Sequence, residues 1–460
     1  MVLHRMNRVH MSRLDELSES VFPAGIAMEE DLVKSGANRR HRLVRALTGR
    51  DTDSFARGWL GKVLVGIILL VAPVVMLFAS LRRGTYADDG WRAVLVLAVL
   101  AVVYFVSRRV LLTVLVAGLV VGLTSWAMVP AVATAHHGDR TVLSRLDIER
   151  GTGRLDGFHD VSVALVDLGA TQSARFGGLG SDMATPMEVG SLTKAMTGLV
   201  IADSVQRGEL RMGVPISTYL PELEGSLAGT VTMNELVTHT AGYAEFGAET
   251  LRRAVWNAPF GRNFFDTDMT QMIQEAREGT LTTRGHYAYS TLGAAVAGQA
   301  VAAAAGMSYS KLMRTRLFTP LGMIHTAIED EHSLVSKGRS KSGLPVEPWV
   351  LRAYAPGGGA VSTAGDLAKL ATALLDGTAP GMTALNPTTP TSQPDTHVGG
   401  FWYTTTQTSS RTVTWHSGET GGYSTYFGLD RANHRAAIVL SDVANRATDE
   451  LGRELLTNRN

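Results

Sequence analysis

The stretch Val189-Gly190-Ser191-Leu192-Thr193-Lys194 is the most informative part of this sequence. An apolar pattern typical of a helix continues from it, with Leu192, Met196, Leu199, Val200 and Val205. If Ser191 opens this helix, Lys194 lies three residues on, on the same face, and its amine can reach the serine hydroxyl. A helix N-terminus also places partial positive charge where an oxyanion would form. Because burial can lower the pKa of a lysine enough to make it a base, the stretch predicts a serine nucleophile with a lysine partner.

The spacing Ser-x-x-Lys is weak evidence by itself. It recurs at Ser308-Tyr309-Ser310-Lys311, where the surrounding pattern is that of an ordinary amphipathic helix, and we interpret this second match as a coincidence. Ser191 differs because a series of distinctive segments follows it. In chain order these are VTHTAG (237–242), YAYST (287–291), PLGM (320–323), GGGAVSTAGDL (357–367) and WHSGETGG (415–422).

In this order the segments resemble the β-lactamase-related serine hydrolase family, which includes class C β-lactamases, penicillin-binding proteins and D-alanyl-D-alanine carboxypeptidases and esterases. The resemblance covers about Arg150 to Val443 and does not extend to the N-terminal part. It implies an α+β fold of the β-lactamase/transpeptidase type, with an antiparallel sheet flanked by helices and a helical subdomain. The ordered motifs are specific for the family but not for a substrate.

Carried over residue by residue, the resemblance implies that Ser191 is the nucleophile and Lys194 its activating partner. Tyr289 would share the proton transfer, with Tyr287 as a competitor for that role. The backbone N–H groups of Ser191 and Glu419 would form the oxyanion hole. The substrate site would be lined by Thr291, His416, Ser417 and Gly418.

Two positions depart from the family pattern. Thr291 stands where the motif usually has asparagine, and a threonine cannot supply the same donor and acceptor pair. His416 replaces a lysine that would attract a carboxylate. It could orient a carboxylate, protonate a leaving group, or be a structural residue of a strand. We interpret His239 as a structural residue of a turn. Both departures favour an ester or an uncharged amide over a β-lactam or a D-alanyl-D-alanine peptide.

Composition excludes several other classes. The 460 residues contain no cysteine, which rules out disulfides, thiolate metal sites and cysteine nucleophiles. The formal net charge of +1 provides no global field for nucleic acid. HExxH pairs, Walker-type loops and GxGxxG after a strand are absent from the sequence. We therefore expect no metal, no cofactor and no nucleic-acid partner.

Three apolar runs precede the motifs, and they predict about three transmembrane helices. They are Val63–Ser80, Ala93–Val106 and Val110–Ala133. A buried helical hairpin is the alternative. Basic residues before the first run and at Arg108-Arg109 predict cytoplasmic ends, which places the rest of the chain outside the cell membrane. The second run is short, and if it does not cross, the catalytic region would face the cytoplasm.

The expected organisation is therefore a polar cytoplasmic tail (1–60), a membrane region (61–134), a linker (135–149) and a hydrolase domain (150–460). Strand patterns at 161–169, 411–415, 424–429 and 435–441 enclose a mostly helical middle, which predicts one sheet joining both ends of the domain. The stretch Asn386–Asp395 is expected to be a mobile surface loop.

We expect a membrane-anchored serine hydrolase that forms an acyl-enzyme with a small-molecule or peptide ester or amide, either esterase-like or related to cell-wall peptides. The alternative is a membrane-bound binding or sensory protein with weak turnover, which Thr291 suggests. Transport or signalling by the spans ranks last, because none of the three carries an acid or a base.

Overall fold

The computed structural model describes residues 118, 130–169, 173–328, 338–408, 411–444 and 446–457. The predicted tail, the first two apolar runs and nearly all of the third lie outside these residues, so the membrane region stays a prediction. Within the described part, no single helix has both the length and the hydropathy needed to cross a bilayer. One bent pair, Thr291–Ala304 with Tyr309–Phe318 at 75°, passes by length and composition only.

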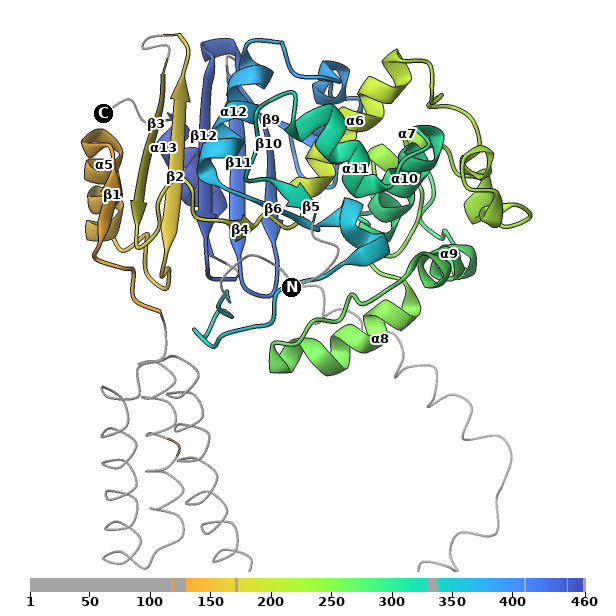
Figure 1. Cartoon of the computed structure of the whole chain (residues 1–460), viewed down its shortest axis with the longest axis horizontal. Helices are drawn as coiled ribbons and strands as arrows, with labels where there is room; N and C mark the ends of the chain where they lie inside the picture. The colour runs from red at the N-terminus through yellow and green to blue at the C-terminus, as the bar shows by residue number, and fades with distance from the viewer. Residues whose placement is uncertain are drawn as a thin grey trace, which may run out of the picture. The chain divides into compact units, whose positions relative to one another are not determined.

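The elements follow the expected order of strands, helices and strands (Figure 1). The described helices are α5 (Arg140–Gly151), α6 (Leu192–Gln206), α7 (Met233–Val237), α8 (Ala248–Asn257), α9 (Met269–Glu278), α10 (Thr291–Ala304), α11 (Tyr309–Met313), α12 (Ala364–Leu375) and α13 (Thr448–Thr457). The described strands are β1 (His136–Gly138), β2 (Val161–Asp167), β3 (Ser173–Leu179), β4 (Met187–Glu188), β5 (Ala327–Ile328), β6 (Ala360–Ser362), β7 (Thr389–Pro390), β8 (Thr396–Gly399), β9 (Trp402–Thr408), β10 (Arg411–Glu419), β11 (Ser424–Asp430) and β12 (Arg435–Ser441). Short 3-10 or π turns are η1 (Ile216–Thr218), η2 (Pro221–Leu223), η3 (Ala228–Thr230), η4 (Ala258–Phe260), η5 (Arg314–Phe318), η6 (Arg352–Gly357), η7 (Met382–Leu385) and η8 (Arg431–Asn433).

A nine-stranded antiparallel sheet is the frame of the domain. Its order is β1-β3-β2-β12-β11-β10-β9-β8-β7, and a smaller sheet has the order β4-β6-β5. Strand β2 from the start of the domain pairs with β12 from its end, with Val163 opposite Val439. This pairing confirms the prediction that one sheet joins both ends of the domain.

Helices cover both faces of the large sheet. Alternation along β2 sends Val161 and Val163 into one apolar core and Ala164 and Val166 into the other. Helices α5 and α13 contribute to the first core, while α6, α10 and α12 contribute to the second. Figure 1 shows α5 and β1 at one end of the sheet and the helical subdomain, with α7, α9 and α10, at the other.

The segment 135–149 was predicted as a linker, and the structure corrects this. Strand β1 pairs with β3 at the edge of the sheet, and α5 begins at the N-cap Asp139, whose side chain accepts the N–H of Thr141. Within α5 the apolar side chains buried against the sheet are Val142 and Leu146. The helix also carries Leu143 and the exposed Ile148, so its apolar residues do not form one clear face that would distinguish a helix from a linker.

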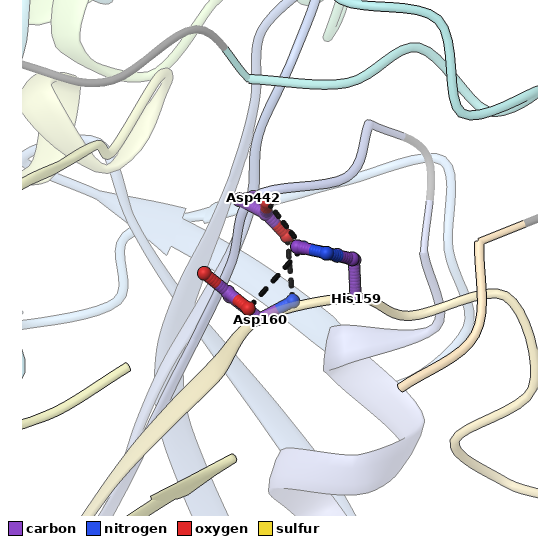
Figure 2. Close-up of side chains that lie close together, drawn as sticks. All are labelled: His159, Asp160 and Asp442. Carbon is purple, nitrogen blue, oxygen red and sulfur yellow. Dashed lines mark hydrogen bonds and ion pairs between the residues drawn. The ribbon is translucent and has the colours of Figure 1, made fainter. Parts of the chain in front are cut away.

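A cluster of charged side chains links the start of β2 to the end of β12, two adjacent strands that come from opposite ends of the domain (Figure 2). His159 precedes β2, and its Nδ1 lies 2.9 Å from Asp442 Oδ2 and 3.2 Å from Asp160 Oδ1. Asp442 follows β12 and accepts the N–H of Asp160 at 2.7 Å. Because Arg339 Nε lies 3.5 Å from the same carboxylate and balances its charge, we interpret the cluster as a structural clamp.

Candidate active site

Ser191 lies at the start of α6, directly after a tight backbone turn. Gly190 has a φ of 50°, in the left-handed region that glycine tolerates without strain. Ser191 occupies the N-cap position of α6, but its side chain accepts no capping hydrogen bond from the helix. Serine N-caps usually do accept such a bond, so this hydroxyl is left for other partners.

Lys194 lies one turn further on and is fully buried. Its Nζ lies 3.0 Å from Ser191 Oγ, 3.2 Å from Thr291 Oγ1 and 2.5 Å from the carbonyl oxygen of Gly357. The carbonyl can only accept, so it takes one N–H of the amine. If Thr291 accepts the second N–H of a neutral amine, the lone pair of the nitrogen remains available to accept the proton of Ser191.

Burial also sets the protonation state of this lysine. The loss of hydration lowers the pKa of Lys194 from 10.5 to about 7, and the charge of Glu245 opposes the shift only in part. A substantial fraction of the amines is therefore uncharged near neutral pH and able to accept a proton.

Tyr289 reaches Ser191 from the opposite side. Its Oη donates to Ser191 Oγ at 2.7 Å, and burial raises the pKa of the phenol, which stays protonated at neutral pH. Tyr287 instead lies with its Oη 2.8 Å from Tyr403 Oη. Of the two tyrosines considered in the sequence, the structure brings Tyr289 to the serine.

Thr291 closes the arrangement. Besides accepting from Lys194, its hydroxyl forms a hydrogen bond with Tyr289. The ring therefore runs from Ser191 to Lys194, to Thr291, to Tyr289 and back to Ser191. Such a ring lets a proton leave the serine and travel toward the tyrosine without a separated charge in the buried site.

Two glycines bring β10 against the start of α6. A Cβ at Gly418 would overlap the carbonyl oxygen of Val189 and lie 3.0 Å from the nitrogen of Ser191. A Cβ at Gly190 would lie 2.7 Å from the nitrogen of Glu419. The two N–H groups predicted to form an oxyanion hole thus belong to two closely packed backbone segments, and their role stays a prediction.

His416 is a buried residue of β10 that lines the same cavity as Ser191. Its Nδ1 lies 2.5 Å from the carbonyl oxygen of Ser417, so the proton belongs on Nδ1. Its Nε2 is buried and has no partner among the described residues. Burial, aided by the charge of Lys194, lowers the pKa of His416 to about 3. At neutral pH this position therefore presents a neutral acceptor and no cation.

The sequence matches the family model described as Beta-lactamase over residues 148–458, which is more than half of the chain. The chain belongs to the beta-lactamase family. The resemblance drawn from the ordered motifs is therefore confirmed, and with it the assignment to a family of serine hydrolases.

The relatives of this beta-lactamase-family chain are distant. It is 28% identical over 190 residues to a protein named Beta-lactamase from Escherichia coli K12, covering 40% of this chain and 46% of the relative. It is 29% identical over 205 residues to Penicillin-binding protein 4 of Amycolatopsis lactamdurans, covering 42% and 51%. The chain thus spans about half the length of these curated relatives.

The solved structure of a beta-lactamase/D-alanine carboxypeptidase from Pseudomonas syringae aligns with a TM-score of 0.59 at 17% identity. The alignment covers 70% of this chain and 99% of that one. This likeness confirms the predicted α+β fold, an antiparallel sheet with flanking helices.

The cavity of this beta-lactamase-family domain has a volume of about 550 Å³. Ser191, Tyr289, Thr291, Ser417, Gly418 and Glu419 line it together with His416. Thr391, Ser392 and Gln393 also line it, although the sequence predicted only a mobile surface loop there. No local pattern marks these three residues, because they reach the cavity through the pairing of β7 and β8 at the edge of the sheet.

Glu188 is a buried acid that the sequence analysis did not single out. Its Oε1 accepts the N–H of Trp349 at 2.6 Å, and its side chain also bonds to Thr420, the neighbour of Glu419. Burial raises the pKa of this carboxyl to about 7. Glu188 therefore links the strand before the nucleophile to the segment after β10. Its position three residues before Ser191 was the available signal.

His239 was predicted to be a structural turn residue. It has a φ of 57°, and its Nδ1 accepts the N–H of Ser290 at 3.2 Å. Its ring packs against that of Tyr289 with centroids 4.7 Å apart. These contacts hold Tyr289 in place, so His239 is a positioning residue for the tyrosine.

The second Ser-x-x-Lys match lies elsewhere. Ser308 caps α11 by accepting the N–H of Lys311 at 3.4 Å, and it lines a separate cavity of about 460 Å³. The structure therefore separates this motif from Ser191.

Proposed function

We propose that the chain is a serine hydrolase that acts through an acyl-enzyme on an ester or an uncharged amide. The observation that carries this proposal is the position of Ser191 Oγ, 3.0 Å from Lys194 Nζ and 2.7 Å from Tyr289 Oη. A hydroxyl held between a neutral amine and a phenol, and not used as a helix cap, is arranged for proton removal and attack.

In the acylation step, the neutral amine of Lys194 takes the proton of Ser191 as Oγ bonds to the substrate carbonyl carbon. The carbonyl oxygen becomes an oxyanion and accepts hydrogen bonds from the N–H groups of Ser191 and Glu419. The intermediate then collapses, and the bond to the alcohol or amine breaks. That leaving group takes a proton from Tyr289, which regains one from Lys194 through Thr291.

In the deacylation step, a water molecule attacks the ester formed on Ser191. The same groups remove one proton from this water and return it to the serine oxygen. The products are the free acid and the regenerated enzyme, so the cycle needs no cofactor.

The charges of the cavity support an uncharged reacting group. At neutral pH His416 is uncharged and offers Nε2 as an acceptor near the nucleophile. Among the described lining residues, Arg446 is basic, whereas Glu245, Glu419 and Asp449 are acidic. A lining with this balance does not concentrate anionic substrates.

We also propose that the N-terminal apolar runs anchor the enzyme in the cell membrane with the catalytic domain outside the cytoplasm. The support comes from the sequence, in which three apolar runs are separated by basic residues. The bilayer is then a partner of the protein.

The test is intact mass spectrometry of the full-length protein in detergent after treatment with a fluorophosphonate and, separately, with a penicillin. We expect a fluorophosphonate adduct on Ser191 that is absent from Ser191→Ala, while Ser308→Ala keeps it. A penicillin adduct beside it would move the substrate class toward cell-wall peptides.

The alternative, a binding protein with weak turnover, is motivated by the threonine at position 291. It predicts that ligands stabilise the folded protein while no acyl-enzyme mass forms with either reagent. That result, obtained on folded protein, would refute the hydrolase proposal.

A further inference from the structure

Helix α8 is held to the domain by polar side chains, while its outward side carries apolar residues together with the exposed ion pair of Arg252 and Glu249. Thr250 is fully buried, and its N–H and hydroxyl donate to the carboxylate of Glu275 at 2.8 and 2.9 Å. On the same side, Arg253 donates to the carbonyl of Asp266 at 2.6 Å and to Thr267 Oγ1 at 2.5 Å. Hydrogen bonds of this kind fix the helix to the domain without using its apolar side chains.

Those apolar side chains point outward instead. In α8 and the following η4, the exposed fractions are 51% for Leu251, 62% for Val255, 68% for Trp256 and 70% for Phe260. Single exposed apolar residues are common, but two aliphatic and two aromatic side chains within ten residues mark an interaction surface. We call these four residues the α8 face.

The place of the α8 face in the domain indicates what covers it. Figure 1 shows α8 and the first described residues of the domain, in orange, at the same lower edge. Ala133, the last residue of the third apolar run, donates its N–H to the carbonyl of His159 at 2.9 Å. The described chain is therefore fixed to the domain from the end of the third apolar run onward, and the α8 face lies on the same edge as this point of entry.

We propose that the α8 face is a membrane-docking surface that inserts into the headgroup layer of the bilayer crossed by the N-terminal runs. Exposed leucine and tryptophan on a helix that also exposes an arginine, with a phenylalanine in the turn that follows, are typical of segments that lie in the membrane interface. The proposal rests on the membrane anchor proposed above, but not on the proposed hydrolysis.

Docking also has a consequence for the catalytic site. Phe246, two residues before the start of α8, lines the cavity of Ser191, as do Phe265 and Trp349. Phe246 and Phe265 pack with their ring centroids 5.6 Å apart. A docked α8 would therefore hold an aromatic wall of the cavity close to the lipid surface.

The experiment uses the absence of native cysteines, which lets one introduced cysteine carry one label. Full-length Val255→Cys and Trp256→Cys proteins carry a nitroxide and are reconstituted into vesicles of phosphatidylethanolamine and phosphatidylglycerol. The matched control is Leu227→Cys, which replaces an apolar residue that is 61% exposed in the segment between α6 and α7, outside the α8 face. The measurement is the collision rate of each label with oxygen, which concentrates in lipid, relative to a water-soluble nickel complex.

We expect the oxygen-to-nickel ratio to be several-fold higher at positions 255 and 256 than at 227. In a Phe260→Glu background, the label at 255 should shift toward the value at 227 while Ser191 still reacts with a fluorophosphonate. Equal ratios at all three positions would overturn the proposal. Spin–spin broadening that disappears on dilution with unlabelled protein would overturn it too, because it would assign the α8 face to a second copy of the chain. Since the readout does not depend on turnover, it is independent of the hydrolase proposal.

Discussion

At the scale of single residues, the decisive feature is a lysine deprived of hydration. Lys194 makes hydrogen bonds to two hydroxyls and one carbonyl, none of which is an anion that would stabilise its charged form. Burial therefore dominates and lowers the pKa of the amine to about 7. The same desolvation keeps Tyr289 protonated and His416 neutral.

The pH dependence of the reaction follows from this lysine. In the proposed mechanism the base is the neutral amine, whose population rises as pH increases through its pKa. We therefore expect kcat/KM to rise from pH 5 to a plateau above about pH 8, with a midpoint near 7. Lys194→Arg should lose the activity, since a guanidinium stays charged. Lys369→Arg, at a half-exposed site, is the matched control and should keep the profile. A rate that falls as pH rises through 7 would contradict the role of Lys194 as a base.

Thr291 is the link between the amine and the phenol in the hydrogen-bonded ring. Thr291→Val keeps the shape but removes the hydroxyl that accepts from Lys194, so we expect kcat to fall about tenfold, the effect of one neutral hydrogen bond. Thr291→Ser should recover most of the rate. Steady-state kinetics on a simple ester provide the measurement. If valine is tolerated without a change in kcat, the proton does not pass through this hydroxyl.

At the scale of elements, the site depends on the close packing of β10 against the turn that begins α6. This contact places the backbone of Glu419 next to that of Gly190 and Ser191, and it leaves no room for a Cβ at Gly418. The proposed oxyanion hole therefore depends on two elements that are far apart in the sequence.

Substitution of this glycine should separate the two elements. Gly418→Ala would push β10 away from Val189, and we expect kcat to fall about 10²-fold, as for the loss of one oxyanion donor, with a smaller change in KM. Gly213→Ala is the control, because a Cβ there meets no atom within 4 Å. Kinetics of both variants at one pH suffice. Equal activity of the two would place the oxyanion elsewhere.

At the scale of the whole molecule, the large sheet contains strands from both ends of the domain, so its integrity depends on the contacts between β2 and β12. The cluster of His159, Asp160, Asp442 and Arg339 lies where β2 begins and β12 ends (Figure 2). Asp442 is nearly buried, and its carboxylate contacts the N–H of Asp160, the ring of His159 and the guanidinium of Arg339. The loss of this carboxylate removes a partner from all three groups.

Removal of this carboxylate should destabilise the domain. We expect Asp442→Ala to lower the melting temperature of the full-length protein in detergent by about 5 °C, which corresponds to about 2 kcal/mol. Asp147→Ala is the surface control, since that carboxylate is half exposed in its pair with His136 and should cost little. Circular dichroism with heating gives both values. An unchanged melting temperature for Asp442→Ala would show that the clamp does not stabilise the domain.

Much of the fold and site could be predicted locally. Strands β2, β10, β11 and β12 appear as apolar alternation or β-branched runs, and Ser191, Lys194 and Tyr289 lie in short motifs in a fixed order. The helix α5 was not predicted, because its apolar residues do not form one clear face: Ile148 is exposed and the polar Glu149 is buried. The loop residues Thr391–Gln393 could not be placed in the cavity, because only the pairing of β7 with β8 brings them there.

The sequence by itself identified the family and predicted Ser191 as the nucleophile with its neighbours in the motifs, because a one-turn spacing and a chain order are local properties. Only the tertiary structure decided which tyrosine meets Ser191, since Tyr287 and Tyr289 differ by two residues and their hydroxyls reach different partners. The tertiary structure also decided the protonation state of Lys194. Desolvation depends on all the elements packed around a side chain, and no motif contains that information.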